Sequence, residues 1–238
     1  MHINLTDKSY SLSIRMSPDG FSLSVYSEDN DLLSSERHSI HNADLTQCLG
    51  SVCASLPGFE SVSLVVITDT YTLIPAILFD ADRAKDFLQL QHPALTETSQ
   101  VLHTYYQHAG SMLIYAFDKQ AIKAVQSVFP QINIKHHLHQ LIEANQDATG
   151  EQLSLWLRPG KVDCLASRGN SIQLLNSYPF QTEEDIVYHV LNMLHHLHFK
   201  HETIQITIYR ETDISIQPEN IMRNYFPSVN LKNIPKDI

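Results

Sequence analysis

The stretch that decides the fold is LSLWLRPGKVDCLASRGNSIQLLNS, residues 153–177. Its apolar residues fall in three short runs with Gly and Pro between them, which is typical of strands joined by tight turns. The predicted strands are 153–157, 162–167 and 172–177. Thr182 and the three acids after it can cap a long helix that ends near His198. A strand over 203–209, a short helix over 218–225 and an edge strand over 229–234 complete this part of the chain.

The same order of elements occurs earlier in the chain. Strands are predicted over 10–15, 21–27, 32–38 and 63–68, and a helix capped by Asn42 or Asp44 runs through Leu45 to Leu56. Residues 71–107 fit the repeat less well and are predicted to form a small inserted subdomain. The pattern then resumes with strand 111–117, a helix capped by Asp118, strand 132–136 and helix 138–144. We therefore predict an α/β fold of two β-β-β-α-β-α halves, residues 1–149 and 150–238.

This element order resembles the duplicated ribonuclease-H-like architecture of the actin-like ATPases. One local likeness is more specific: SLVVIT, the insertion, SMLIYAFDKQAIKAVQSVFPQINIK and HHLHQLIEANQ follow one another as in the pilus-assembly branch of that superfamily. The chain thus resembles a bacterial family of unknown function with a degenerate actin-like fold. The resemblance implies two halves with a cleft between them, where actin-like ATPases bind nucleotide.

A phosphate site would need glycines and acids in the first hairpin of each half, because backbone amides hold phosphate and carboxylates help to hold Mg²⁺. The hairpins here are Ser17-Pro18-Asp19-Gly20 and Arg158-Pro159-Gly160-Lys161. Each proline removes an amide donor, and the whole chain has only seven glycines. The candidates for a vestigial phosphate loop are Ser17, Asp19, Gly20, Gly160 and Lys161. Ordinary turn chemistry also explains each of these residues.

Two hypotheses about function follow. The first is a non-catalytic, degenerate actin-like protein that serves as an interaction module or scaffold, with no catalytic residues and no cofactor. Its partner would be a protein that binds the inserted subdomain or the rim of the cleft. The alternative is a nucleotide or small-ligand binding protein, or an enzyme, that holds ATP and Mg²⁺ in the cleft with the acids Asp19, Asp69 and Asp163.

Fourteen histidines are many for 238 residues. Five of them lie on or just after the predicted helix 182–198, and His136, His137 and His139 form a second cluster. Neutral imidazoles can bind Zn²⁺, so a metal-binding regulator is a third hypothesis. The chain has no HExxH pattern, and solvated or hydrogen-bonded histidines explain both clusters, so we expect no metal site.

Composition also bears on binding partners, membrane insertion and cellular location. The net charge of −10 argues against binding to nucleic acid or to an anionic membrane surface. No apolar stretch is long enough to span a bilayer or to serve as a signal peptide, and the three cysteines have no metal-ligand spacing. We therefore expect a cytoplasmic protein with reduced thiols, and the sequence does not predict its oligomeric state.

Overall fold

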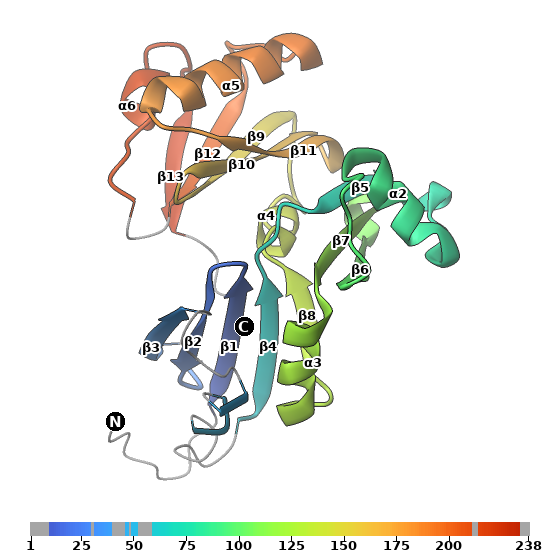
Figure 1. Ribbon diagram of the computed structural model, residues 1–238. Coiled ribbons are helices and arrows are strands. Elements are labelled where there is room, and N and C mark those ends of the chain that lie inside the picture. Colours follow the sequence, from blue (N-terminus) through green and yellow to red (C-terminus); the bar gives the residue numbers. More distant parts are fainter. Residues whose placement is uncertain are drawn as a thin grey trace.

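The computed structural model describes residues 10–29, 31–39, 46–47, 49–51, 59–210 and 214–233. This part of the chain forms two five-stranded sheets and one three-stranded sheet. Figure 1 shows the second five-stranded sheet above the first, with the three-stranded sheet to one side of both. The predicted helix through Leu45 to Leu56, with its caps at Asn42 and Asp44, lies largely outside the described residues.

The first sheet has the strand order β3-β2-β1-β4-β8. Its strands are β1 (Ser11–Ser17), β2 (Gly20–Tyr26), β3 (Leu32–Ser39), β4 (Ser61–Val66) and β8 (Asn133–His136). Side chains alternate between the faces of a strand, so Leu12, Ile14 and Met16 of β1 are buried on one face. The opposite face is polar, and the register aligns Arg15 of β1 with Ser22 of β2 and Ser22 with Arg37 of β3.

The second sheet has the order β11-β10-β9-β12-β13. Its strands are β9 (Glu151–Arg158), β10 (Lys161–Arg168), β11 (Ser171–Pro179), β12 (Gln205–Arg210) and β13 (Val229–Asn233). In both sheets the three hairpin-connected strands are antiparallel, and the fourth and fifth strands join in parallel. The predicted duplication is therefore confirmed at the level of strand order and direction.

The inserted segment belongs to a separate sheet of order β5-β7-β6. Its elements are β5 (Tyr71–Pro75), η2 (Ala76–Leu78), η3 (Ala81–Arg83), α2 (Ala84–Gln91), β6 (Ser99–Tyr106), η4 (Gln107–Ala109) and β7 (Ser111–Asp118). The sequence analysis placed strand 111–117 back in the regular pattern, and this was wrong, because β7 pairs with β5 and β6. Alternate residues of β7 pack on α2 and on the first core, and a strand buried on both faces has the same apolar sequence in either sheet.

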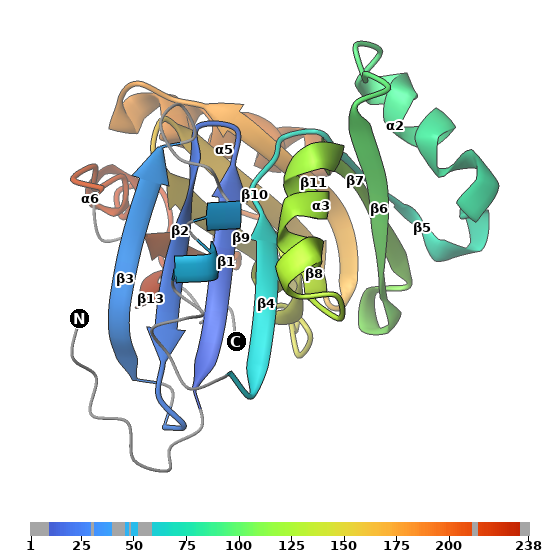
Figure 2. The ribbon, with the colours of Figure 1, turned by 60° about the horizontal axis from the view of Figure 1, so that its bottom comes forward.

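Helices cover the sheets, and α3 and α5 begin at side-chain caps. Asp118 accepts a hydrogen bond from the Ala121 amide and starts α3 (Lys119–Val128), while α4 (His139–Glu143) follows β8. In the second half, Thr182 and Asp185 form a capping box at the start of α5 (Glu183–Leu197), and α6 (Glu219–Met222) precedes β13. Figure 2 shows α3 lying beside β4 and β8, on the side of the three-stranded sheet.

The first hydrophobic core extends across both halves. It includes Ile14 and Leu64 of the first sheet together with Trp156, Leu165 and Tyr209 of the second. A separate cluster packs α5 and α6 on the other face of the second sheet. The two halves are therefore joined by apolar packing as well as by the polar contacts of the candidate site.

Candidate functional site

The first hairpin uses its predicted phosphate-loop residues to make the turn. The Ser17 hydroxyl donates to the Gly20 carbonyl over 3.2 Å, and Asp19 is exposed in the turn. A Cβ atom at position 20 would lie 2.3 Å from the carbonyl oxygen of His38 on β3. Gly20 is therefore required by the close approach of a neighbouring strand, and this explains the glycine without a ligand.

The second hairpin turns through Gly160, whose φ of 70° lies in the left-handed region that favours glycine. The ammonium group of Lys161 forms an ion pair with Asp69. Asp69 belongs to the first half, so this predicted phosphate-loop residue is held by a carboxylate across the boundary between the halves.

Asp163 is the centre of a buried network. Its carboxylate receives hydrogen bonds from Arg158 Nε over 2.6 Å, from Arg158 Nη2 over 2.8 Å and from the Ser177 hydroxyl over 2.5 Å. His137 Nε2 lies 3.2 Å from the same carboxylate. Because Asp163 and His137 are both fully buried, each polar group needs these partners.

The network continues into the first half. Arg158 Nη2 also donates to Asp69 Oδ1 over 3.1 Å, so the two predicted cleft acids Asp69 and Asp163 share one guanidinium. The Tyr71 hydroxyl lies 2.8 Å from the Ser177 hydroxyl. Since Ser177 donates its proton to Asp163, it accepts from Tyr71. We call these residues the inter-half network: Asp69, Tyr71, His137, Arg158, Lys161, Asp163 and Ser177.

The third predicted acid, Asp19, lies at the edge of a different cavity. This cavity has a volume of about 360 Å³, and Arg15, Arg37 and Arg158 also line it. The structure therefore brings Asp69 and Asp163 together and leaves Asp19 apart from them, on the polar face of the first sheet.

The ionisation of the network follows from its geometry. Burial would raise the pKa of the Asp163 carboxyl, but His137 and the hydrogen bonds from Arg158 outweigh it and hold this pKa well below its usual range. Burial lowers the pKa of His137 in spite of the adjacent carboxylate. The neutral His137 ring donates through Nε2, and Asp163 stays ionised opposite Arg158. Burial also raises the pKa of the Tyr71 hydroxyl, which keeps it a donor.

His136 of β8 bonds to the segment that follows β4. Its Nδ1 accepts from the Leu138 amide over 3.2 Å, so its Nε2 carries the proton and donates to the Thr68 carbonyl over 3.0 Å. Burial, and then the neighbouring His137, lower the pKa of His136 well below its usual value. Both rings are therefore neutral and have a structural role, His136 as a donor to Thr68 and His137 as a donor to Asp163.

Several of these residues were missed by sequence reasoning. Arg158 was treated as a turn residue, Ser177 as the end of a strand, and Tyr71 as part of the insertion. One signal was available: Asp163 stands inside the apolar run VDCLA, and a carboxylate on a buried strand needs a cationic partner. The nearest cation along the chain that could reach it across the hairpin is Arg158.

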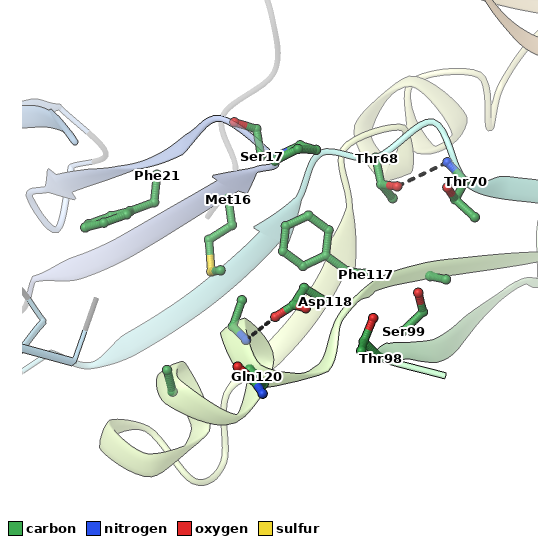
Figure 3. A pocket seen from close by; sticks show the side chains of 14 residues that line it. Met16, Ser17, Phe21, Thr68, Thr70, Thr98, Ser99, Phe117, Asp118 and Gln120 are labelled. Atoms are coloured by element: carbon green, nitrogen blue, oxygen red, sulfur yellow. Dashed lines mark hydrogen bonds between the residues drawn. The ribbon is translucent and has the colours of Figure 1, made fainter. Parts of the chain in front are cut away.

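A groove lies between the first sheet and the three-stranded sheet. Its volume is about 650 Å³. Figure 3 shows Met16 and Phe21 on strands of the first sheet, the Phe117 ring pointing from β7 toward Met16, and Thr98 and Ser99 on the side of the three-stranded sheet. The remaining lining comes from the β1–β2 turn, the segment after β4 and the first turns of α3, namely Ser17, Pro18, Thr68, Thr70, Ala116, Asp118, Gln120, Ala121 and Ala124.

The other candidates are placed more simply. His189 of α5 stacks on Tyr178 with ring centroids 4.6 Å apart, and its Nε2 lies 3.1 Å from the Pro179 carbonyl. Within the described ranges, no group of three His, Cys, Asp or Glu side chains is placed to hold a metal ion. Cys164 is buried, and burial raises the pKa of its thiol, whereas Cys48 and Cys53 lie outside the described residues. No described helix has the length and apolar character needed to cross a membrane.

Residues 2–229 of the sequence match the family described as "Protein of unknown function (DUF3822)". The chain belongs to the DUF3822 family. A Bacteroides thetaiotaomicron VPI-5482 protein, described as having an actin-like ATPase fold and unknown function, superposes on this DUF3822 chain with a TM-score of 0.78. The two are 21% identical, and the match covers 96% of this chain and 94% of that one. The predicted actin-like fold is therefore confirmed.

Two more distant structures share this fold with the DUF3822 chain. A chain of the PilM–PilN type IV pilus biogenesis complex has a TM-score of 0.54 and 7% identity, covering 94% of this chain and 88% of that one. The cytoplasmic domain of EpsL, an inner membrane component of the Vibrio cholerae type II secretion system, has a TM-score of 0.50 and 11% identity, covering 97% and 91%. Comparison with curated protein sequences finds no match.

Proposed function

We propose that this protein is a non-catalytic interaction module that binds an extended segment of a partner protein in the groove. The observation that carries the proposal is a contrast between two sites. The polar groups of the inter-half network bond to one another, whereas the groove, with a volume of about 650 Å³, is open and lined by apolar side chains and hydroxyls.

The groove suits an extended peptide. Met16, Phe21 and Phe117 line the groove from buried positions. Ala121 and Ala124 of α3 are its partly exposed apolar lining. Burying apolar surface is the main favourable term in such complexes. An extended chain also carries unpaired N–H and C=O groups. The hydroxyls of Thr98 and Ser99 can meet those groups, as in other grooves that bind peptides in extended form.

Charge favours a basic or neutral partner over an acidic one. Asp118 lies at the edge of the groove, and the protein has a net charge of −10. Long-range attraction would raise the association rate of a segment with Lys or Arg beside its apolar residues.

The inter-half network supports the non-catalytic part of the proposal. A phosphate between the hairpins would compete with Asp69 for Lys161 and with two carboxylates for Arg158. One of these carboxylates, Asp163, is fully buried. Taking the cation away from a buried carboxylate costs several kcal/mol, on the order of 3–5, so nucleotide binding here is disfavoured.

The distant structures are consistent with a partner-binding role. One is a chain of a complex with a second protein, PilM–PilN, and another is a cytoplasmic domain of a secretion-system component. A cytoplasmic location and a protein partner are the parts of the proposal that these similarities support.

Selection of peptides tests the proposal without knowledge of the partner. A phage-displayed library of random linear peptides is selected on the wild-type protein, and the selected peptides are measured by fluorescence anisotropy. Ala124→Phe places a ring in the groove, and Lys123→Phe places the same ring on the exposed side of α3 as the matched control. We expect apolar, non-acidic peptides whose affinity falls at least tenfold in Ala124→Phe and stays unchanged in Lys123→Phe.

Failure to select any peptide would contradict the proposal. So would selected peptides that bind both variants as tightly as the wild type, because their site would then lie elsewhere.

A second candidate function has one observation in its favour. Arg15, Arg37 and Arg158 line the cavity of about 360 Å³, and Arg15 and Arg37 come from strands separated by β2. Such a set of guanidinium groups could hold a small anion, which would make the protein a ligand-binding member of the actin-like superfamily. A thermal shift with nucleotide separates this candidate from the first.

A further inference from the structure

The segment Thr68–Tyr71 contacts the groove and the second half at the same time. Thr68 and Thr70 line the groove. Asp69 and Tyr71, the alternate residues, contact Arg158, Lys161 and Ser177 of the second half.

The backbone of the same segment is tied to the walls of the groove. The Thr70 amide donates to the Thr68 hydroxyl over 3.1 Å, and Figure 3 shows this bond at the edge of the groove. The Thr70 carbonyl accepts from the Ala116 amide on β7 over 2.9 Å, and Ala116 itself lines the groove. The Thr68 carbonyl accepts from His136.

These bonds leave the segment little freedom to move on one side alone. A displacement of Asp69 toward or away from Arg158 and Lys161 changes the positions of Thr68 and Thr70, and through Thr70 it changes the support of Ala116. The contacts of the second half therefore act on a segment that lines the groove.

We propose that the second half regulates partner binding in the groove, with the segment Thr68–Tyr71 as the coupling element. This inference rests on the proposed function. Partner binding and the Asp69 and Tyr71 contacts favour each other, and by thermodynamic linkage the effect is reciprocal. Any event that draws Arg158 or Lys161 away from Asp69 lowers the affinity of the groove for its partner. A bound partner in turn stabilises the contacts of Asp69 and Tyr71 with the second half.

The first arm of the test measures the affinity of a groove-selected peptide for variants of Asp69 and Tyr71. Asp69→Asn weakens the contacts with Arg158 and Lys161, and Tyr71→Phe removes only the bond to Ser177. Neither side chain is part of the groove lining. We expect peptide affinity to fall about fivefold or more in Asp69→Asn, which is the lower range of measured couplings, and to fall less in Tyr71→Phe. Asp86→Asn, in an exposed pair with Arg83, is the control and leaves the affinity unchanged.

The second arm measures the reciprocal effect in the wild type. Trp156 is the only tryptophan, is 1% exposed, and contacts His137 and Arg15 between the halves. Saturating the groove with the peptide should change the Trp156 emission, and the change should be smaller in Asp69→Asn.

The outcomes separate the two proposals. The coupling would be overturned if peptides bind the groove with equal affinity in the wild type, Asp69→Asn and Tyr71→Phe, and if Trp156 emission does not change. The proposed function of the groove would then still stand. If no peptide binds, the proposed function fails, and hydrogen exchange then decides the coupling. Faster exchange of the Thr70 and Ala116 amides in Asp69→Asn, but not in Asp86→Asn, would support it, and unchanged exchange would overturn it.

Discussion

His137 and Asp163 come from different halves of the chain, and their fully buried side chains lie 3.2 Å apart. The imidazole is neutral and donates to a carboxylate whose charge Arg158 balances. Burial would penalise each of these groups if it stood alone. Together they connect the second sheet to the first through a buried polar contact.

Removing the carboxylate charge is expected to destabilise the protein strongly. Asp163→Asn keeps the shape but leaves the Arg158 guanidinium, whose side chain is 10% exposed, without its buried counter-ion. We expect a loss of about 3 kcal/mol in the free energy of unfolding, measured by urea denaturation. Asp86→Asn breaks an exposed pair and should cost less than about 1 kcal/mol. Equal effects of the two changes would show that the buried Asp163–Arg158 pair contributes no more to stability than an exposed pair.

Stability is expected to fall as the pH drops from 7 toward 5. Burial lowers the pKa of His136 and of His137 in the folded protein, whereas both titrate near a pH of about 6.5 in the unfolded chain. As the pH falls below that value, the two histidines bind protons in the unfolded state but not in the native state, which favours unfolding. The stabilisation is therefore complete above that pH and is lost below it, by at most about 2.7 kcal/mol per pH unit for two sites.

The lowered pKa of Asp163 acts in a different range. Its contribution is present above the unfolded carboxyl pKa of about 3.9 and is lost only as the pH falls below it. Urea denaturation at several pH values between 5 and 8 therefore isolates the histidines. His136→Gln should reduce the slope, with His195→Gln on the exposed face of α5 as the control for losing a histidine. A flat profile in the wild type would argue against neutral, buried rings.

A methyl group at position 20 is expected to destabilise the first hairpin. Gly20→Ala places Cβ 2.3 Å from the His38 carbonyl oxygen, so β2 and β3 must separate. We expect a loss of about 1–3 kcal/mol, the usual range for overpacking. Gly50→Ala is the matched control, because nothing lies within 4 Å of its Cβ and the residue is helical. That change should be neutral or stabilising by up to about 1 kcal/mol. Melting temperatures that fall equally would contradict the strand-contact explanation of Gly20.

Mg²⁺-ATP is expected to leave the melting temperature unchanged. The cations of the second hairpin, Arg158 and Lys161, are bonded to Asp69 and Asp163. A ligand at one hundred times its dissociation constant would add about 2.7 kcal/mol, which is easily visible by scanning fluorimetry. ADP, GTP and inorganic phosphate serve as comparisons. A clear shift that disappears in Arg37→Ala would favour the anion-binding candidate over the interaction module.

The sequence predicted the order of elements well, because the alternation in residues 10–27 and 153–177 is set by local rules of strands and turns. It failed at β7, whose run of buried residues is the same in any sheet that is covered on both faces.

The candidate site was harder to predict than the fold. Asp69 and Asp163 were named as cleft acids, and the apolar run around Asp163 indicates a cationic partner. Nothing in the sequence indicates that Asp69 shares Arg158 with Asp163, because the contact between positions 69 and 158 depends on how the halves pack. The groove depends on how β5, β6 and β7 stand against the first sheet, and no local pattern encodes that arrangement.

The hydrophobic cluster that joins Ile14 and Leu64 to Trp156, Leu165 and Tyr209 has a consequence for cooperativity. Two duplicated halves with separate interiors could melt one after the other. Here side chains of the second half complete the interior of the first, so unfolding of either half exposes part of this shared cluster. Heat or denaturant is therefore expected to produce one transition, and a change in either half should shift that single transition.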